Sequence, residues 1–270
     1  MTAIESGIDA LAPVDGLAVS LADGVLSVTI DRPGSLNSLT LPVVVGLADA
    51  MEQAADDLRV KVVRLGGSGR GFCSGAGVST ADVTGAGLGA ELVMAANRVV
   101  RAITALPRPV VAVVQGPVAG FGVSLALACD LVLASDAAFF MLAFTKIGLM
   151  PDGGASALIA AAIGRIGAMR MALLPERVPA ADALAAGLIS AVYPASDFEV
   201  EVDKVVAGLL TGPVAAFAKT KEAINAATLI ELKPTQQREL EGQSALLKSP
   251  DFREGALAFQ QRRTPRFTDS

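Results

Sequence analysis

The sequence of 270 residues has no histidine and no tryptophan, a single tyrosine and only two cysteines. The lack of histidine excludes Ser-His-Asp and Cys-His catalytic arrangements, and with them the usual histidine ligation of zinc. Any acid–base chemistry must therefore use carboxylates, lysines, Tyr193 or water. The two cysteines, Cys73 and Cys129, lie in apolar surroundings. We predict that they are buried, unreactive thiols, which fits a reducing cytoplasm.

A strong excess of charge is also lacking, because the net charge is only −5. Such a chain has no bulk attraction to nucleic acid or to an anionic membrane. The first residues carry acids where a signal peptide needs bases, and the apolar segment 109–134 is interrupted by Gln115, Pro117 and Asp130. We therefore expect a cytoplasmic protein with no membrane span and no nucleic-acid partner.

Hydrophobic residues make up 52% of the chain, enough for a large core, and the length suits one α/β domain with an appendage. Strand and helix patterns alternate, which predicts a largely parallel sheet wound with helices. Strands are expected at 17–21, 25–31, 60–65, 110–114, close to 135 and at 189–193, and helices at 40–57, 90–106, 123–128, 154–163, 165–174 and 179–186. The glycine-rich segment 80–89 is expected to form a mobile lid over a pocket.

The last part of the chain is predicted to be entirely helical. Helices are expected at 198–210, 214–228, 231–248 and 250–262. Leucines are spaced among charges along this tail, so each helix is amphipathic and cannot bury its apolar face alone. The tail should therefore pack on the core or on another subunit.

Two glycine-rich loops each follow a predicted buried strand. The first lies within 64–79 and the second within 108–135. In the second loop, Gly120 and Gly122 flank the first amides of a short helix, where unsatisfied N–H groups and the helix dipole favour negative charge on an oxygen. Two such loops can face each other across a site.

These loops, FCSGAG and GPVAGFGVSLALACD, resemble the two oxyanion-forming segments of the crotonase family, the enoyl-CoA hydratase/isomerase superfamily. The resemblance continues through IDRPGSLNSLT, GLMPDGGAS, ADALAAGLISAVYP and DFREGALAFQQRRTPRF. It implies an α/β fold, a spiral of ββα repeats in residues 1–200, followed by a C-terminal helical trimerisation region at 201–270. It also implies homotrimers or dimers of trimers. The implied partner is an acyl-CoA thioester, in which coenzyme A is part of the substrate, with no further cofactor and no metal.

By the same resemblance, the backbone amides of Ala76 and Phe121 stabilise the oxygen of a thioester enolate. Phe121 stands at a place that is often glycine, but the donor is an amide, so the change alters pocket shape more than electrostatics. Gly77 stands where many relatives have aspartate, which implies no role for its side chain.

The catalytic carboxylates depart from the hydratase pattern. Ser124 and Phe144 occupy the positions of the two hydratase glutamates, and neither can act as a general base. Asp152, in GLMPDGGAS, stands where isomerases of this superfamily place a single carboxylate base. Nearby apolar side chains are expected to exclude water from the Asp152 carboxyl and so to raise its pKa; they are Met150, Phe139, Phe140 and Phe144. The alternative is an ordinary Pro-Asp-Gly-Gly turn, in which the aspartate bonds its own backbone.

The resemblance also implies a coenzyme A site. It assigns to this site Gly34, Ser35, Leu36, Ser38, Ser74, Ala76 and Val78 from the first half of the chain, and Phe259, Arg262 and Arg263 from the tail. Gly34 replaces a lysine common in relatives, which moves the phosphate contacts toward the arginines. The alternative for these arginines is a solvated basic helix end. NAD is rejected, because Leu125 stands where a dinucleotide fingerprint needs its third glycine.

Three functions remain open at this point. The first is an enoyl-CoA isomerase that shifts a 3-enoyl-CoA double bond to 2-enoyl-CoA with Asp152 as base. The second is a hydratase or another thioester reaction, such as hydrolysis, in which Asp152 activates water or attacks directly. The third is a non-catalytic acyl-CoA-binding protein, which would use the same two amides.

Overall fold

The structure is a computed structural model that describes residues 7–78, 81–82 and 89–268. The predicted lid at 80–89 lies mostly outside the described residues. The main sheet of the protein is built from β1 (Leu17–Ala22), β2 (Val25–Ile30), β3 (Val62–Gly67), β4 (Val110–Val114), β6 (Leu131–Ser135) and β9 (Ala191–Tyr193). The helices before the tail are α1 (Leu41–Asp56), α3 (Ala90–Ala105), α4 (Phe121–Leu127), α5 (Ala155–Leu173) and α6 (Ala180–Ala185).

These strands form one sheet in the order β1-β2-β3-β4-β6-β9, in which only the β1–β2 hairpin is antiparallel. The prediction of a largely parallel sheet is therefore confirmed. Side chains alternate between its faces: Val110 and Ala112 pack toward α1 and α3, whereas Val111 and Val113 pack toward α7 (Phe198–Leu210). Burial on both faces explains why β4 reads as an unbroken apolar run.

A second, smaller sheet contains β5 (Val118–Ala119), β7 (Phe139–Met141) and β8 (Val178–Pro179) in the order β5-β7-β8. None of these strands was predicted, because two or three residues are too short to show a hydrophobic period. The small sheet supports the second glycine loop, since the Gly120 N–H donates to the Met141 carbonyl at 3.0 Å.

The two helices predicted at 154–163 and 165–174 form α5, which is interrupted at Gly164 by non-helical backbone angles (φ 72°, ψ 170°). By length and composition, α5 could cross a membrane. A span, however, needs about 20 continuous helical residues, and the interruption leaves two short pieces. The first piece packs against α4 and against α9 (Leu232–Leu246). We therefore assign α5 to the folded core.

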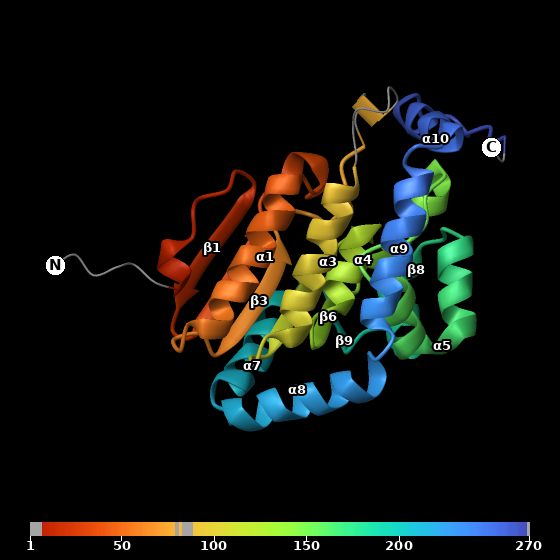
Figure 1. Ribbon diagram of the computed structural model, residues 1–270. Helices are drawn as coiled ribbons and strands as arrows, with labels where there is room; N and C mark the ends of the chain where they lie inside the picture. Colours follow the sequence, from red (N-terminus) through yellow and green to blue (C-terminus); the bar gives the residue numbers. More distant parts are fainter. Residues whose placement is uncertain (1–6, 79–80, 83–88, 269–270) are drawn as a thin grey trace.

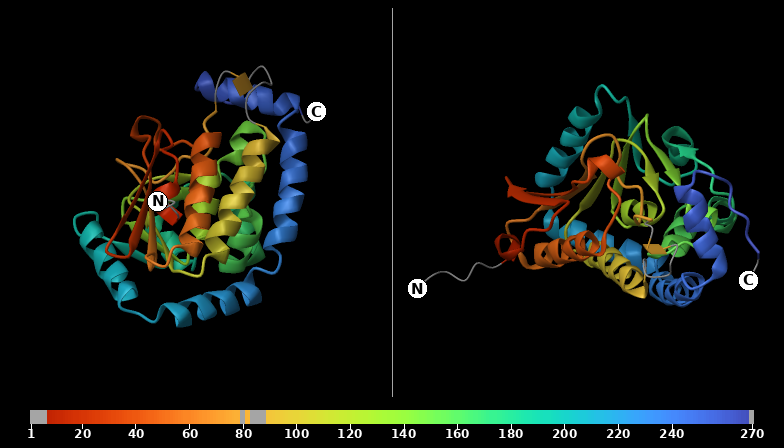
Figure 2. Two further views of the ribbon diagram at one scale, coloured as in Figure 1. Left: turned by 60° about the vertical axis from the view of Figure 1, so that its left-hand side comes forward. Right: turned by 90° about the horizontal axis from the view of Figure 1, so that it is seen from above.

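The four predicted tail helices are present as α7, α8 (Val214–Thr228), α9 and α10 (Pro250–Gln260). In Figure 1, α8 crosses the base of the molecule, and α9 then runs upward beside α3 and α5 to α10 at the other end. The two views of Figure 2 show the same path around the core. The predicted boundary at residue 200 lies inside α7, which covers one face of the large sheet.

Candidate active site

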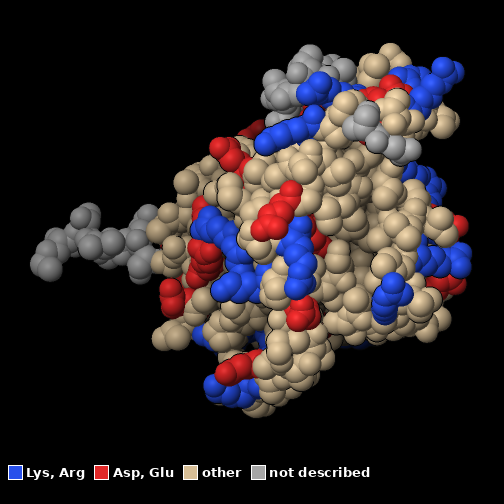
Figure 3. Space-filling view, turned by 45° about the vertical axis from the view of Figure 1, so that its right-hand side comes forward, with Lys and Arg blue, Asp and Glu red and all other residues tan. Residues whose placement is uncertain are grey.

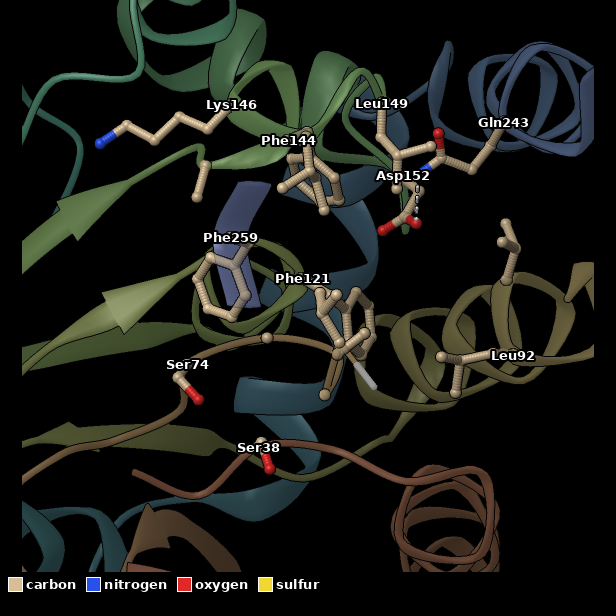
Figure 4. A pocket seen from close by; sticks show the side chains of 18 of the residues that line it. Ser38, Ser74, Leu92, Phe121, Phe144, Lys146, Leu149, Asp152, Gln243 and Phe259 are labelled. Carbon is tan, nitrogen blue, oxygen red and sulfur yellow. Dashed lines mark hydrogen bonds between the residues drawn. The ribbon is translucent and has the colours of Figure 1, made fainter. Parts of the chain in front are cut away.

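A pocket of about 590 Å³ lies where the two glycine loops meet the tail. Its lining combines Gly75 and Ala76 of the first loop with Gly120 and Phe121 of the second. Asp152, Gln243 and Phe259 complete it from segments far apart in the sequence. Figure 4 shows Phe121, Asp152, Gln243 and Phe259 around one space, with Leu92 of α3 on the far side from Lys146. The fold thus brings together most of the segments that the sequence analysis singled out.

The two glycine loops run side by side, as predicted. Cys73 forms a parallel bridge with Val118, and the Ala119 N–H donates to the Cys73 carbonyl at 2.8 Å. A β-carbon on Gly75 would lie 2.9 Å from the Ala119 carbonyl oxygen and 3.4 Å from the Phe121 amide nitrogen. With φ at +86°, only glycine fits this close approach without strain.

The amides of Ala76 and Phe121 are both available at the pocket. Ala76 pairs with Leu39 through the hydrogen bonds of its two neighbours, Gly75 and Gly77, so its own N–H faces away from that pair. Phe121 begins α4, where the first amides have no partner within the helix. Across the described part of the chain, neither amide donates a hydrogen bond. Two such donors are the requirement for stabilising a developing oxyanion.

The Asp152 side chain lines the pocket, and its two carboxylate oxygens differ in their hydrogen bonding. Oδ2 accepts a hydrogen bond from Gln243 Nε2 at 3.1 Å, whereas Oδ1 is buried and has no partner among the described residues. Burial raises the pKa of Asp152 to about 7; the Gln243 hydrogen bond opposes this rise, and the charge of Glu239 adds to it. Near neutral pH the carboxyl therefore exists in both forms, as a proton-transferring group requires.

The turn itself forms, because the Asp152 carbonyl accepts from the Ala155 N–H at 3.2 Å. The side-chain bond that the turn alternative required is absent, since the Asp152 carboxylate accepts from Gln243 instead of from the backbone of its own turn. The same carbonyl also accepts from the Ser124 hydroxyl at 2.7 Å. Ser124 is fully buried and has this structural contact, and Phe144 lines the pocket. Within the described lining, Asp152 is thus the only carboxylate and Lys146 the only cation.

The family model for enoyl-CoA hydratase/isomerase matches residues 20–270. The chain belongs to the enoyl-CoA hydratase/isomerase family. It is accordingly an enzyme of the hydratase/isomerase type with the α/β crotonase fold, and the family implies acyl-CoA substrates. The third alternative, a non-catalytic binder, is therefore not carried further.

Relatives agree with this assignment. A crystal structure of an enoyl-CoA hydratase from Mycobacterium avium subsp. paratuberculosis is 72% identical, with a TM-score of 0.90 over 95% of this chain and 100% of that chain. A probable enoyl-CoA hydratase of Rhodobacter capsulatus is 40% identical over 92% of this chain and 96% of its own. The 1,2-epoxyphenylacetyl-CoA isomerase of Escherichia coli is 35% identical over 91% of this chain and 95% of its own.

The hydratase/isomerase pocket holds only some of the predicted coenzyme A residues. Its lining includes Ser35, Ser38, Ser74, Val78 and Phe259 but not Gly34, Leu36, Arg262 or Arg263. Arg263 is paired with Glu254 at 2.6 Å, as in the alternative of a solvated basic helix end. Lys146, which the sequence analysis did not single out, lines the pocket with its ammonium pointing away from Asp152 (Figure 4).

The apolar surroundings of Asp152 come only in part from the predicted residues, since Met150, Phe139 and Phe140 are not in the pocket lining. Phe144 does line the pocket, but Phe140 is buried in β7 and the Phe139 ring lies 4.6 Å from the Arg177 guanidinium carbon. Leu92, Leu149 and Leu247 also belong to the apolar lining of the pocket. The prediction of a raised pKa is confirmed, with burial as its main cause.

Both cysteines are buried, as predicted, and neither is part of the pocket lining. Burial raises the pKa of the Cys73 thiol to about 12 and also raises the pKa of the Cys129 thiol. Neutral thiols of this kind are poor nucleophiles, so they take no part in the chemistry.

The sequence analysis missed Gln243 and Glu239 of α9, the residues that surround Asp152 from the tail. A signal was present, because the buried positions Leu232, Gln236, Glu239 and Gln243 follow one another at spacings of three and four. The leucines of this segment do not mark the pattern, since the side of α9 that faces the core is mostly polar.

Proposed function

We propose that this enzyme moves the double bond of a 3-enoyl-CoA to the 2-position, with Asp152 as the single base. The observation that carries the proposal is that the described pocket lining contains one carboxylate together with Ala76 and Phe121, whose backbone amides are unpaired. A two-glutamate hydration mechanism has no support at Ser124 and Phe144.

The proposed reaction needs one proton transfer in each direction. Ionised Asp152 takes the proton from carbon 2 through Oδ1, and the electron pair of that bond moves into the thioester carbonyl. The resulting enolate oxygen accepts hydrogen bonds from the Ala76 and Phe121 amides. Protonated Asp152 then returns the proton to carbon 4, and the double bond forms between carbons 2 and 3. No group is gained or lost.

The lining supports an uncharged acyl chain as substrate. Beside Asp152 the wall is formed by Phe121, Phe144, Leu92 and Leu149, and the one cation of the described lining points away from that region. A carboxylate at the end of the acyl chain would lose its hydration there without gaining a partner.

For coenzyme A we propose the residues given by the resemblance. Ser35, Ser38, Ser74 and Val78 would contact the thioester arm, together with the neighbouring Gly34 and Leu36. Phe259, 61% exposed, offers a ring face for adenine. Arg262 and Arg263 at the end of α10 supply positive charge for the phosphates.

Hydration of 2-enoyl-CoA is the second candidate, because the structure that is 72% identical is described as an enoyl-CoA hydratase. In that reaction Asp152 would activate water for addition at carbon 3, and it would then need a water site next to Oδ1. Hydrolysis of the thioester would use the same carboxyl on a different carbon.

A panel of substrates distinguishes these reactions. Purified protein is incubated with 3-enoyl-CoA, 2-enoyl-CoA and saturated acyl-CoA of equal chain length, and products are identified by mass and ultraviolet absorbance. We expect 3-enoyl-CoA to give 2-enoyl-CoA of unchanged mass. Rapid addition of water to 2-enoyl-CoA with no isomerisation, or release of free coenzyme A, would contradict the proposal.

A further inference from the structure

Helix α9 buries polar side chains where a helix packed on a core normally buries apolar ones. Gln236, Glu239 and Gln243 are 2%, 1% and 2% exposed, respectively. Burial of unpaired polar groups is costly, so such a face persists only where each group has a hydrogen-bonding partner. The partners of two of these residues lie on either side of Asp152.

The Gln243 amide joins two parts of the segment 150–152. Its Oε1 accepts from the Met150 N–H at 3.1 Å, and its Nε2 donates to Asp152 Oδ2 at 3.1 Å. Because a backbone N–H can only donate, this contact fixes which end of the amide is oxygen. The NH₂ group is therefore directed at the carboxyl.

Glu239 holds the other side of the same segment. Its two carboxylate oxygens accept from the Gly154 N–H at 2.6 Å and the Ser156 N–H at 2.9 Å, at the start of α5. A β-carbon on Gly154 would lie only 2.4 Å from the Leu232 side chain, and φ there is +83°. The backbone on both sides of Asp152 is thus fixed against α9.

We propose that Gln243 is a positioning residue for the base, which holds Oδ2 of Asp152 so that Oδ1 alone is presented to carbon 2 and carbon 4 of the acyl chain. This inference rests on the proposed isomerase function. Without the amide, the carboxyl would rotate about its last side-chain bond, and no oxygen would stay at the reacting distance. Glu239 is the charged neighbour that raises the pKa of Asp152. Burial raises the pKa of Glu239 as well, and the hydrogen bonds from the Gly154 and Ser156 amides oppose that rise.

The test compares Gln243→Met with Gln236→Met. Methionine keeps the length of glutamine and removes both hydrogen bonds. Gln236 is the matched control, because it is on the same buried face of α9, two helical turns away, and contacts Asn97 and Arg101 of α3 instead of Asp152. We expect Gln243→Met to lower kcat on 3-enoyl-CoA by about 10²-fold with KM nearly unchanged. Gln236→Met should keep kcat.

A second readout follows the carboxyl itself. In protein labelled with ¹³C at aspartate carboxyls, the Asp152 signal is assigned by its loss in Asp152→Asn and titrated with pH. The Gln243 hydrogen bond stabilises the ionised form, so its removal should raise the pH midpoint. If Gln243→Met does not fold, Gln243→Glu replaces it, because a carboxylate there keeps the acceptor for Met150 and should raise the midpoint further.

The outcomes are distinct. An unchanged kcat together with an unchanged Asp152 midpoint in Gln243→Met would overturn the proposal. A loss of kcat equal in both variants, with an unchanged midpoint, would overturn it in favour of a general packing effect. Wild-type protein that leaves 3-enoyl-CoA unchanged refutes the proposed function, and the titration then decides the inference: a raised midpoint upholds the orientation of Asp152, and an unmoved one refutes it.

Discussion

At the scale of single residues, the chemistry depends on the effects that set the pKa of one carboxyl group. Asp152 loses hydration in the pocket, and the charge of Glu239 also disfavours its ionised form, whereas Gln243 stabilises that form. The result is a group able to take and return a proton near neutral pH. Position 152 was found from the sequence; its hydrogen-bonding partner Gln243 lies 91 residues further on and is brought to it by tertiary structure.

The first prediction concerns the pH dependence of isomerisation. The base must be ionised, so kcat/KM for 3-enoyl-CoA should rise with pH and level off above the Asp152 pKa of about 7. Initial rates measured from about pH 5.5 to about pH 9 in buffers of constant ionic strength would show this. A profile that is flat across neutral pH would mean that another group limits the reaction.

The second prediction concerns stability. The pKa of Asp152 is raised from 3.8 to about 7 in the folded protein, so between these values the folded state keeps a proton that the unfolded chain has lost. The contribution of protonated Asp152 to the free energy of unfolding is therefore fully present at low pH and declines as pH rises toward 7. In the Asp152→Asn variant this position does not titrate. Relative to that variant, wild-type protein should lose stability between about pH 4 and about pH 7, as measured by urea unfolding. A constant difference would contradict this.

At the scale of elements, α8 has no fully buried residue, and its polar contacts with the core come from Lys221 and from Asn225, whose Nδ2 donates to the Thr104 carbonyl of α3 at 3.0 Å. Lys221 Nζ donates to the Ile103 carbonyl at 2.8 Å at the end of α3 and to Asp130 Oδ2 at 2.8 Å. Asp130 also accepts from the Val110 N–H at 2.7 Å, at the start of β4. Lys221 thus connects α8 to α3 and to the large sheet.

The third prediction follows from these contacts. Lys221→Met should lower the free energy of unfolding by about 1–3 kcal/mol, because it leaves carbonyl and carboxylate acceptors without their donor. Lys219→Met is the matched control: Lys219 lies on the same helix but pairs with Glu222 on the surface. Urea midpoints of the two variants should differ clearly. Equal midpoints would show that α8 is attached by other contacts.

Elements of five residues or more were predictable from periodicity and glycine punctuation, as β4 and the four tail helices show. The strands β5, β7 and β8 were not, since so few residues carry no period. The helix predicted at 40–57 begins one residue later, because Thr40 precedes α1 as its N-cap residue, although its side chain makes no capping bond. The polar face of α9 could not be assigned, because a sequence does not show which partners will satisfy it.

At the scale of the whole molecule, the surface has little excess of one charge. On the face shown in Figure 3, basic and acidic side chains lie mostly beside one another. The second half of α5 instead exposes apolar side chains, with Ile166 77% and Leu173 65% exposed. Exposed apolar patches of this kind are typical of protein interfaces.

The fourth prediction is a homotrimer, or a dimer of trimers, as the family resemblance implies. Light scattering on the purified protein should give three or six times the mass of the 27.3 kDa chain. Ile166→Glu combined with Leu173→Glu should lower the mass if α5 lies at the interface, because it places charge in apolar contact. A wild-type protein that is monomeric at micromolar concentration would contradict the prediction.

The central claim is that one carboxylate carries the reaction, and Asp152→Asn tests it most directly. Asparagine keeps the shape and the backbone contact of Asp152 with Ser124 but cannot accept a proton. With saturating 3-enoyl-CoA, we predict that the rate of 2-enoyl-CoA formation falls by at least about 10²–10⁴-fold, while acyl-CoA still binds with similar affinity. A variant that isomerises 3-enoyl-CoA at the wild-type rate would contradict this.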